Sequence, residues 1–202
     1  MDGSKENYET KKYHFVGIPN LTIQVPSQWL ADRVKASFLG DYPVEVVYNT
    51  VNREVFKPVP SDFREKHGLQ DKIILLGVAN IWEERKGLKD FIALSRLLDD
   101  RYKIVLVGLT PEQSRDLPKN ILCLLRTDNI RQLVEIYSAA DLHGCPSVEE
   151  TFGMTILEAY CCGTESIVYE GTACAEIVRL YGGTAVPRGA EYLKQAICRL
   201  KK

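Results

Sequence analysis

The chain has 202 residues, of which 26 are basic and 27 acidic, so its formal net charge is −1. This balance gives no overall field that would attract nucleic acid or an anionic membrane, and any anionic ligand must be held by local groups. A hydrophobic fraction of 45% and a charged fraction of 26% are typical of a soluble globular protein. The length suits one α/β domain with an additional segment.

The N-terminal sequence Met-Asp-Gly-Ser-Lys-Glu is too polar for a signal peptide, and no run of about 18 apolar residues is present. We therefore expect a cytoplasmic location. The six cysteines contain no Cys-x-x-Cys pair, and the adjacent Cys161 and Cys162 would point about 100° apart on a helix. This arrangement indicates reduced thiols and no metal site.

Residues 1–13 are charged and weakly patterned, so we treat them as peripheral. From Leu21 onward, short β-rich runs alternate with longer runs of helical period, as in a parallel sheet wrapped by helices. The expected strands are 21–25, 44–47, 73–79, 103–107, 121–124, 166–169 and 184–186. The expected helices are 28–38, 86–98, 130–139, 153–161, 173–180 and 189–199. The sequence predicts an α/β fold with a doubly wound parallel sheet, whose most apolar strands are buried on both faces.

A segment without regular period separates two parts of the chain. It covers residues 48–60 and contains Pro58 and Pro60, which mark a linker. We place the domain boundary here, with residues 1–48 forming a peripheral part and residues 49–202 forming the main domain.

In an open parallel sheet, ligands bind beyond the carboxyl ends of the strands. The loop that follows the expected strand 73–79 covers residues 80–87 and delivers Arg85 and Lys86 to a helix start. A helix N-terminus already attracts anions through its free N–H groups and its dipole. This loop predicts a phosphate contact, or else a solvated loop in which neighbouring glutamates neutralise the two cations.

A second loop, followed by a helix, carries the stronger signal. Gly153 lets the backbone approach a ligand, so the amides of Phe152, Gly153 and Met154 are expected to face an anion. Glu158 lies about one turn inside the helix, where its carboxylate can accept two hydrogen bonds from a ribose diol. Glu150 lies in the loop, and we expect it near the part of the ligand that extends beyond the phosphates.

The two carboxylates also admit other interpretations. Glycosidases use paired carboxylates that flank one bond at about 5–10 Å, although the phosphate-binding features here argue against hydrolysis. In a purely structural role, Glu150 would cap the helix and Glu158 would form a surface ion pair.

These residues resemble the Glu-x7-Glu motif of the retaining GT-B glycosyltransferases of family 4, also called group 1. That motif reads Pro-Ser-x-x-Glu-x-Phe-Gly, followed by Glu-Ala and a Cys-Gly-Thr turn. The matching positions are Pro146, Ser147, Glu150, Phe152, Gly153, Glu158, Ala159, Cys162, Gly163 and Thr164. Further matches lie at residues 48–58, 86–87, 137–141 and 175–178. The resemblance extends over nearly all of the chain from Leu21.

The resemblance implies the Rossmann-like C-terminal half of a GT-B fold, which binds a nucleoside diphosphate sugar (NDP-sugar) as hexosyl donor. Glu150 and Lys86 would be the catalytic residues, at the donor sugar and the diphosphate. Glu158 would bind the ribose, and the amides of residues 152–154 would support the phosphates. No metal or other cofactor is implied, because cations and a helix terminus stabilise the leaving diphosphate. The implied process is the synthesis of polysaccharides or lipid-linked glycans.

The sequence departs from the family pattern at several positions. Asn80 stands where many members carry an arginine of the diphosphate site. Either Arg85 supplies the missing cation, since a guanidinium group suits phosphate geometry, or the nucleoside site is weaker. Glu165 replaces the proline that commonly follows the Cys-Gly-Thr turn. The strand before Pro146 is usually apolar in the family, whereas residues 143–145 here read His-Gly-Cys.

The largest departure is length, because the family's enzymes join two Rossmann-like domains. Residues 21–38 resemble the last strand and helix of the first domain, and residues 49–202 resemble the second. The expected partners are therefore an NDP-sugar and the missing N-terminal domain or an equivalent protein, without nucleic acid. The resemblance also admits peripheral membrane association of the full enzyme. The chain alone is expected to bind a donor without transferring the sugar.

Two other functions stay open. A shortened chain could serve as a non-catalytic module that binds a protein through the former pocket face. A dehydrogenase on a similar fold is disfavoured, because the G-x-G-x-x-G turn after the first strand is missing. The sequence does not specify the nucleobase, the sugar or the acceptor.

Overall fold

The computed structural model describes residues 3–200 and divides into two units, Met1–Asn49 and Thr50–Lys202. This boundary lies one residue from the one expected from the sequence. Within residues 3–200, no helix combines the length and the apolar character needed to span a membrane.

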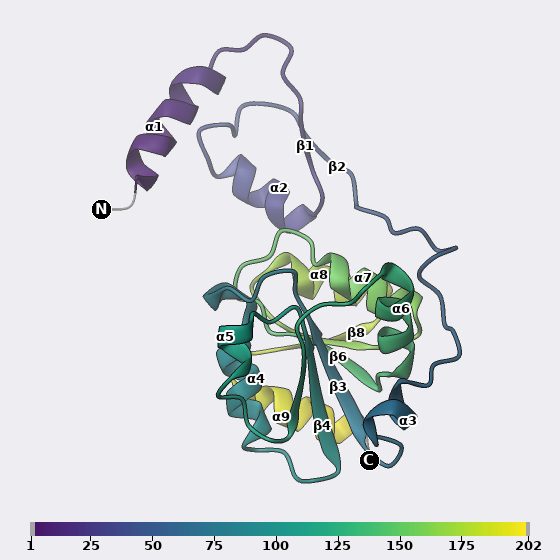
Figure 1. The fold of residues 1–202 in the computed structure, drawn as a ribbon. Helices are drawn as coiled ribbons and strands as arrows, with labels where there is room; N and C mark the ends of the chain where they lie inside the picture. The colour runs from purple at the N-terminus through teal and green to yellow at the C-terminus, as the bar shows by residue number, and fades with distance from the viewer. Residues whose placement is uncertain (1–2, 201–202) are drawn as a thin grey trace. The chain divides into compact units, whose positions relative to one another are not determined.

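The first unit contains two helices and a pair of parallel strands (Figure 1). Helix α1 (Ser4–Phe15) precedes strand β1 (Ile23–Val25), helix α2 (Gln28–Lys35) and strand β2 (Val44–Val46). The hydroxyl of Tyr42 accepts hydrogen bonds from the amides of Gly17 and Ile18 at 2.7 and 3.0 Å. These bonds connect the segment after α1 to the loop between α2 and β2, on which Tyr42 lies. Two strands are fewer than the four to six of a usual sheet.

The second unit is built on a six-stranded sheet in which all strands are parallel (Figure 1). The strands are β3 (Ile73–Val78), β4 (Tyr102–Val107), β5 (Ile121–Leu124), β6 (Leu142–Cys145), β7 (Ser166–Tyr169) and β8 (Gly183–Val186). Their spatial order is β5-β4-β3-β6-β7-β8, so the winding reverses between β3 and β6. This is the order of a doubly wound Rossmann-like sheet, and the predicted fold class is confirmed.

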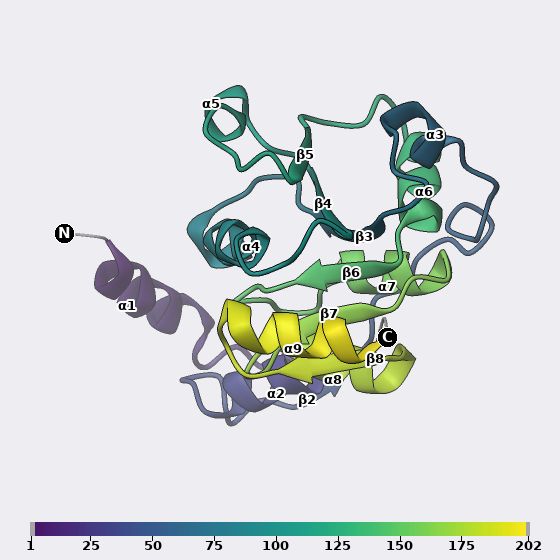
Figure 2. The ribbon, with the colours of Figure 1, turned by 90° about the horizontal axis from the view of Figure 1, so that it is seen from below.

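Helices cover both faces of this sheet. They are α3 (Phe63–His67), α4 (Leu88–Ser95), α5 (Pro111–Ser114), α6 (Ile130–Ala139), α7 (Met154–Cys161), α8 (Ala173–Tyr181) and α9 (Ala190–Leu200). A short 3₁₀ turn, η1 (Glu84–Lys86), precedes α4. Figure 2 shows α4 and α9 on one face of the sheet and α6 and α7 on the other.

The alternation of side chains along the strands divides the core into two layers. In β3, Leu75 packs into the cluster that contains Phe91 of α4. Its neighbours Ile74 and Leu76 pack into the cluster that contains Tyr137 of α6. Each fully buried aliphatic side chain of this kind contributes about 1.5–3 kcal/mol to folding. The continuous apolar runs of the central strands are therefore required by helices on both faces.

Strand β6 lies in the middle of the sheet, although its sequence Leu-His-Gly-Cys does not give an apolar run. The ring of Phe91 explains the glycine. A Cβ atom on Gly144 would lie 2.9 Å from Cζ of Phe91, and one on Gly77 of β3 would lie 2.7 Å from the same atom. The glycines of the two neighbouring strands thus leave room for one aromatic ring. Strand β6 is therefore explained by this packing and not by an apolar sequence pattern.

Candidate functional site

The loops that follow β3 and β6 meet at the carboxyl edge of the sheet, where the winding reverses. This is the position at which doubly wound folds bind their ligands. Gly87 has φ of +78°, and a Cβ atom there would lie only 2.4 Å from the carbonyl oxygen of Pro146. The amide of Val148 donates to the carbonyl oxygen of Arg85 at 2.9 Å. The two loops are therefore in direct backbone contact.

This contact brings Lys86 and Glu150 together. The Nζ atom of Lys86 donates to Oε2 of Glu150, and the two side chains are only 24% and 16% exposed. The second oxygen, Oε1, accepts from the amide of Thr151 at 3.3 Å. A charged pair with this little exposure is screened less than a surface pair. An anion that approaches Lys86 has to compete with Glu150 for it.

Lys86 does not lie in the helix that was expected from residue 86 onward. It ends the 3₁₀ turn η1, and α4 begins only at Leu88, after the left-handed Gly87. Arg85 in the same turn donates through Nε to Oε2 of Glu83 at 2.7 Å and through Nη1 to the carbonyl oxygen of Glu149 at 3.3 Å. These two contacts of Arg85 stabilise the loop that carries Glu150.

The loop after β6 leads into α7 through Gly153, which has φ of +94° and caps the helix. A Cβ atom there would lie 2.7 Å from Cδ1 of Ile156, so the turn is tightly packed. Phe152 is buried in the core, while Met154 is 37% exposed. The amide of Ile156 donates to the carbonyl oxygen of Gly153 at 3.0 Å. The amides that begin a helix have no preceding turn to bond, so those of Met154 and Thr155 can be offered to an anion.

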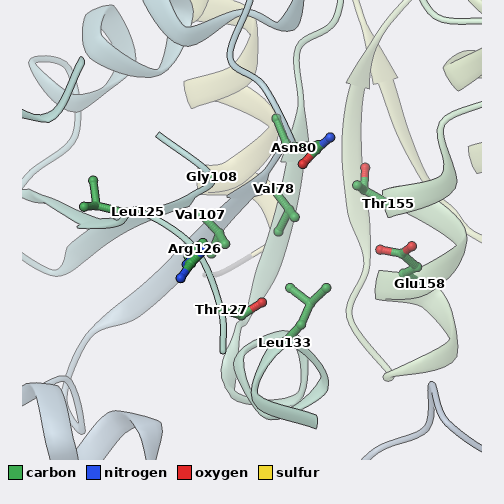
Figure 3. Close-up of a pocket in the computed structure, with 11 residues that line it drawn as sticks. Val78, Asn80, Val107, Gly108, Leu125, Arg126, Thr127, Leu133, Thr155 and Glu158 are labelled. Atoms are coloured by element: carbon green, nitrogen blue, oxygen red, sulfur yellow. The ribbon is translucent and has the colours of Figure 1, made fainter. Parts of the chain in front are cut away.

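A pocket of about 370 Å³ opens beside this helix (Figure 3). It is lined by Val78, Ala79, Asn80, Val107, Gly108, Leu125, Arg126, Thr127, Leu133, Thr155 and Glu158. In Figure 3, Thr155 and Glu158 project from α7 on one side of the pocket, and Thr127 lies on the loop across from them. The size lies within the range of small-molecule sites, and the lining combines apolar walls with a few polar groups.

A buried tyrosine holds the carboxylate of Glu158 through a hydrogen bond. The hydroxyl of Tyr137 donates to Oε2 of Glu158 at 2.9 Å. Burial raises the pKa of Glu158, and the hydrogen bond from Tyr137 opposes that rise. The pKa of Tyr137 lies well above its usual range because the ring is buried and a carboxylate is nearby. Tyr137 therefore stays a hydrogen-bond donor.

The predicted site residues fall into three groups. Lys86 and Glu150 form one ion pair, and Asn80 and Glu158 line one pocket. Of residues 152–154, Gly153 caps α7 and Met154 is its first residue. Arg85 belongs to none of these groups, because its guanidinium group contacts Glu83 and a backbone carbonyl. Of the predicted site residues, Asn80 and Glu158 line the pocket, whereas Lys86, Glu150, Arg85 and residues 152–154 are not among its lining residues.

The sequence reasoning assigned no role to several residues that build the site. Tyr137 belonged to a matched motif, yet its contact with Glu158 spans 21 positions and has no signature in the spacing. Trp82, buried in the loop after β3, donates from Nε1 to the carbonyl oxygen of Val107 at 2.9 Å. A buried tryptophan in a charged loop is the one signal that could have shown that this loop is anchored.

Comparison with known proteins defines the family. Residues 60–202 match the family described as "Glycosyl transferases group 1". Since the match covers most of the chain, this protein belongs to the group 1 glycosyltransferases. The chain spans only 30% to 44% of the length of the curated relatives that it matches.

One such relative is the alpha-galactosylglucosyldiacylglycerol synthase of Streptococcus pneumoniae. The two sequences are 30% identical in an alignment of 175 positions that covers 76% of this chain and 44% of the relative. Among solved structures, sucrose-phosphate synthase of Thermosynechococcus elongatus aligns with a TM-score of 0.83 at 20% identity, over 100% of this chain and 54% of its own. HepE of Anabaena, solved with UDP and glucose, aligns with a TM-score of 0.82 at 18% identity, over 98% and 58%. At these identities the structures establish the fold.

Proposed function

We propose that this chain is the donor-binding half of a retaining glycosyltransferase and binds an NDP-sugar at the carboxyl edge of β3 and β6. The observation that carries the proposal is the meeting, at that edge, of the Lys86–Glu150 ion pair, the free start of α7 and the pocket that contains Glu158. These groups offer a cation and amides to a diphosphate and a carboxylate to a ribose diol. The complexes of HepE with UDP and with UDP-glucose support the same class of ligand.

The ion pair gives the proposed site a defined first step. The diphosphate takes over the ammonium group of Lys86, which releases one oxygen of Glu150. That carboxylate then accepts hydrogen bonds from hydroxyls of the donor sugar. When the bond between the sugar and the diphosphate breaks, negative charge grows on the phosphate oxygens, and Lys86 and the amides at the start of α7 stabilise it. In this proposal Asn80 and Arg85 border the donor, and no divalent metal takes part.

We further propose that the transfer step needs a second domain besides residues 49–202. We propose that residues 1–48 include the last strand and helix of an N-terminal GT-B domain, and that residues 49–202 form the donor domain. The missing domain would hold a glycan or lipid-linked acceptor, as in polysaccharide synthesis. The 202-residue chain, which we propose acts in the cytoplasm, would then bind the donor without transferring the hexosyl group.

Calorimetry with the full 202-residue chain tests the binding. UDP, GDP and ADP, and the glucose or mannose derivative of each, form the panel, and we expect one nucleotide to bind clearly better than the others. Lys86→Ala and Glu158→Ala should each weaken that binding about tenfold or more, since each removes a charge-assisted contact. Lys89→Ala is the matched control, because Lys89 is 80% exposed and pairs only with Glu84 among the described salt bridges of residues 3–200.

Two results would count against the proposal. Equal, weak heats of binding for the wild type and for both site variants would show that Lys86 and Glu158 do not form a nucleotide-binding site. A loss of binding in EDTA that Mg²⁺ restores would contradict the metal-free diphosphate site. If no nucleotide binds while sedimentation shows a stable dimer, the chain is better explained as a protein-interaction module.

A further inference from the structure

We propose that Tyr137 is a positioning residue of the donor site, which fixes the carboxylate of Glu158 in the orientation that a ribose diol requires. The inference rests on the proposed function, in which Glu158 accepts hydrogen bonds from the ribose. It adds a residue that lies outside the pocket and contacts no ligand itself.

The ring of Tyr137 is held on several sides. It is fully buried on α6, with Phe56 and His143 packed edge-on at centroid distances of 6.5 and 5.9 Å. The carbonyl oxygen of Tyr137 accepts from Oγ1 of Thr164 at 2.6 Å, which ties this part of α6 to the turn that follows α7. The phenol oxygen therefore occupies one defined position beneath Glu158, and its bond of 2.9 Å links α6 to α7.

The bond leaves the carboxylate able to bind a diol. An ionised carboxylate has about four acceptor positions, of which the tyrosine hydroxyl uses one, on Oε2. The other oxygen does not take part in this bond, and Figure 3 shows the carboxylate of Glu158 projecting from α7 toward the pocket. A glutamate side chain has several rotatable bonds, and fixing it before the ligand arrives removes an ordering cost from binding. Tyr137 supplies that fixation.

The charge state of Glu158 depends on the same hydroxyl. Burial raises the pKa of Glu158, and the hydrogen bond from Tyr137 lowers it again, because that bond favours the carboxylate. The other titratable groups near Glu158 are Cys162, the residue that follows α7, and Arg126 on the loop that lines the pocket. His143 beside the Tyr137 ring is neutral, since burial lowers its pKa to about 3. No described group other than Tyr137 donates a hydrogen bond that offsets the burial.

The test replaces Tyr137 by phenylalanine, which removes one oxygen atom and keeps the ring in its apolar surroundings. Carbon-13 NMR follows the titration of Glu158, whose signal is assigned by its absence in Glu158→Gln. In Tyr137→Phe we expect a higher pKa of Glu158 than in the wild type. An unchanged pKa would overturn the proposal on the free protein, without any ligand.

A second measurement separates positioning from general damage. UDP, GDP and ADP are each titrated beside the 2′,3′-dideoxy form, which lacks the ribose hydroxyls. We expect Tyr137→Phe to weaken the ribose form about tenfold and to leave the dideoxy form unchanged, since a lost bond to a charged group is worth about that factor. In a Glu158→Gln background, Tyr137→Phe should have no further effect on the ratio of the two affinities.

Tyr102→Phe is the matched control. Tyr102 is also buried, but it lies on β4 and its hydroxyl contacts Sγ of Cys198 at 3.8 Å. We expect its titration and affinities to equal those of the wild type. Equal weakening of the ribose and dideoxy forms by Tyr137→Phe would mean a structural role only and would overturn the proposal. If the wild type binds no nucleotide while the pKa of Glu158 still shifts, the proposed function fails and the ribose role fails with it, whereas the Tyr137–Glu158 bond stands.

Discussion

Gly87 sets the distance between the two loops of the site, so Gly87→Ala is the most direct test of how that site is assembled. The new Cβ atom would lie 2.4 Å from the carbonyl oxygen of Pro146 and 2.7 Å from its Cγ atom. Relief of this overlap requires the loops to separate by about 1 Å, since ordinary contacts begin near 3.4 Å. The left-handed conformation adds about 1–2 kcal/mol of strain, and the overlap adds about 1–2 kcal/mol more.

We therefore expect Gly87→Ala to lower the free energy of unfolding by about 2–4 kcal/mol in urea denaturation. Nucleotide affinity should fall about tenfold or more, because Lys86 moves away from the start of α7, with which it would hold the diphosphate. Gly68→Ala is the matched control. Gly68 is also left-handed, with φ of +64°, but its Cβ atom would have no neighbour within 4 Å. A loss of stability equal to that of Gly68→Ala, with unchanged affinity, would refute the reasoning.

Three further substitutions test other parts of the domain. Arg64→Leu removes an ion pair with Asp141 at 2.6 Å and hydrogen bonds to backbone carbonyls, and urea denaturation should show a loss of about 2–3 kcal/mol. Trp82→Phe removes the bond to Val107 and should cost about 2 kcal/mol by the same assay, with weaker nucleotide binding in calorimetry. Burial lowers the pKa of His143 to about 3. Below pH 6.5 this histidine is therefore protonated in the unfolded chain but not in the folded chain, so the free energy of unfolding decreases as the pH is lowered. His143→Phe should remove about 3 kcal/mol of the stability difference between pH 7 and pH 4, measured by denaturation at both values.

The sequence predicts the fold class and the most apolar strands well, because strands that are buried on both faces need apolar residues. β3 is a continuous apolar run and β4 is one from Ile104 onward, and both strands were expected within a residue or two of their observed ends. β6 lacks such a run, since Gly144 makes room for a ring from α4 and His143 points into the opposite layer. That strand is determined by tertiary packing, which no local pattern contains.

The same distinction applies to the site. The spacing of Glu150 and Glu158, with a glycine between them, indicates a loop and a helix start, and the structure has both. The direction of a long side chain is set by contacts elsewhere in the chain. Arg85 was expected at a phosphate, yet Glu83 lies two residues away and holds its guanidinium group at 2.7 Å. Sequence reasoning found the charged groups and could not decide between their partners.

The buried carboxylate of Glu158 has opposite effects on folding stability and on ligand binding. Its pKa is raised in the folded chain because the carboxylate is partly buried. A raised acid group contributes stability only while it is protonated, below its unfolded value near 4.5, and this contribution is lost as the pH rises through the folded value. At neutral pH the ionised group therefore lowers the stability of the fold.

Glu158→Gln should then be more stable than the wild type at pH 7, because the amide keeps the shape, carries no charge and can still accept the hydrogen of Tyr137. The advantage should shrink below about pH 4.5, where the wild type is protonated as well. Denaturation at pH 7 and pH 4 measures this, with the exposed Glu170→Gln as control. The same variant should lose the preference for ribose over dideoxyribose nucleotides, and the wild type should lose affinity as acid protonates Glu158. A variant that is less stable at both pH values would show that the burial of this carboxylate is not what opposes its ionisation.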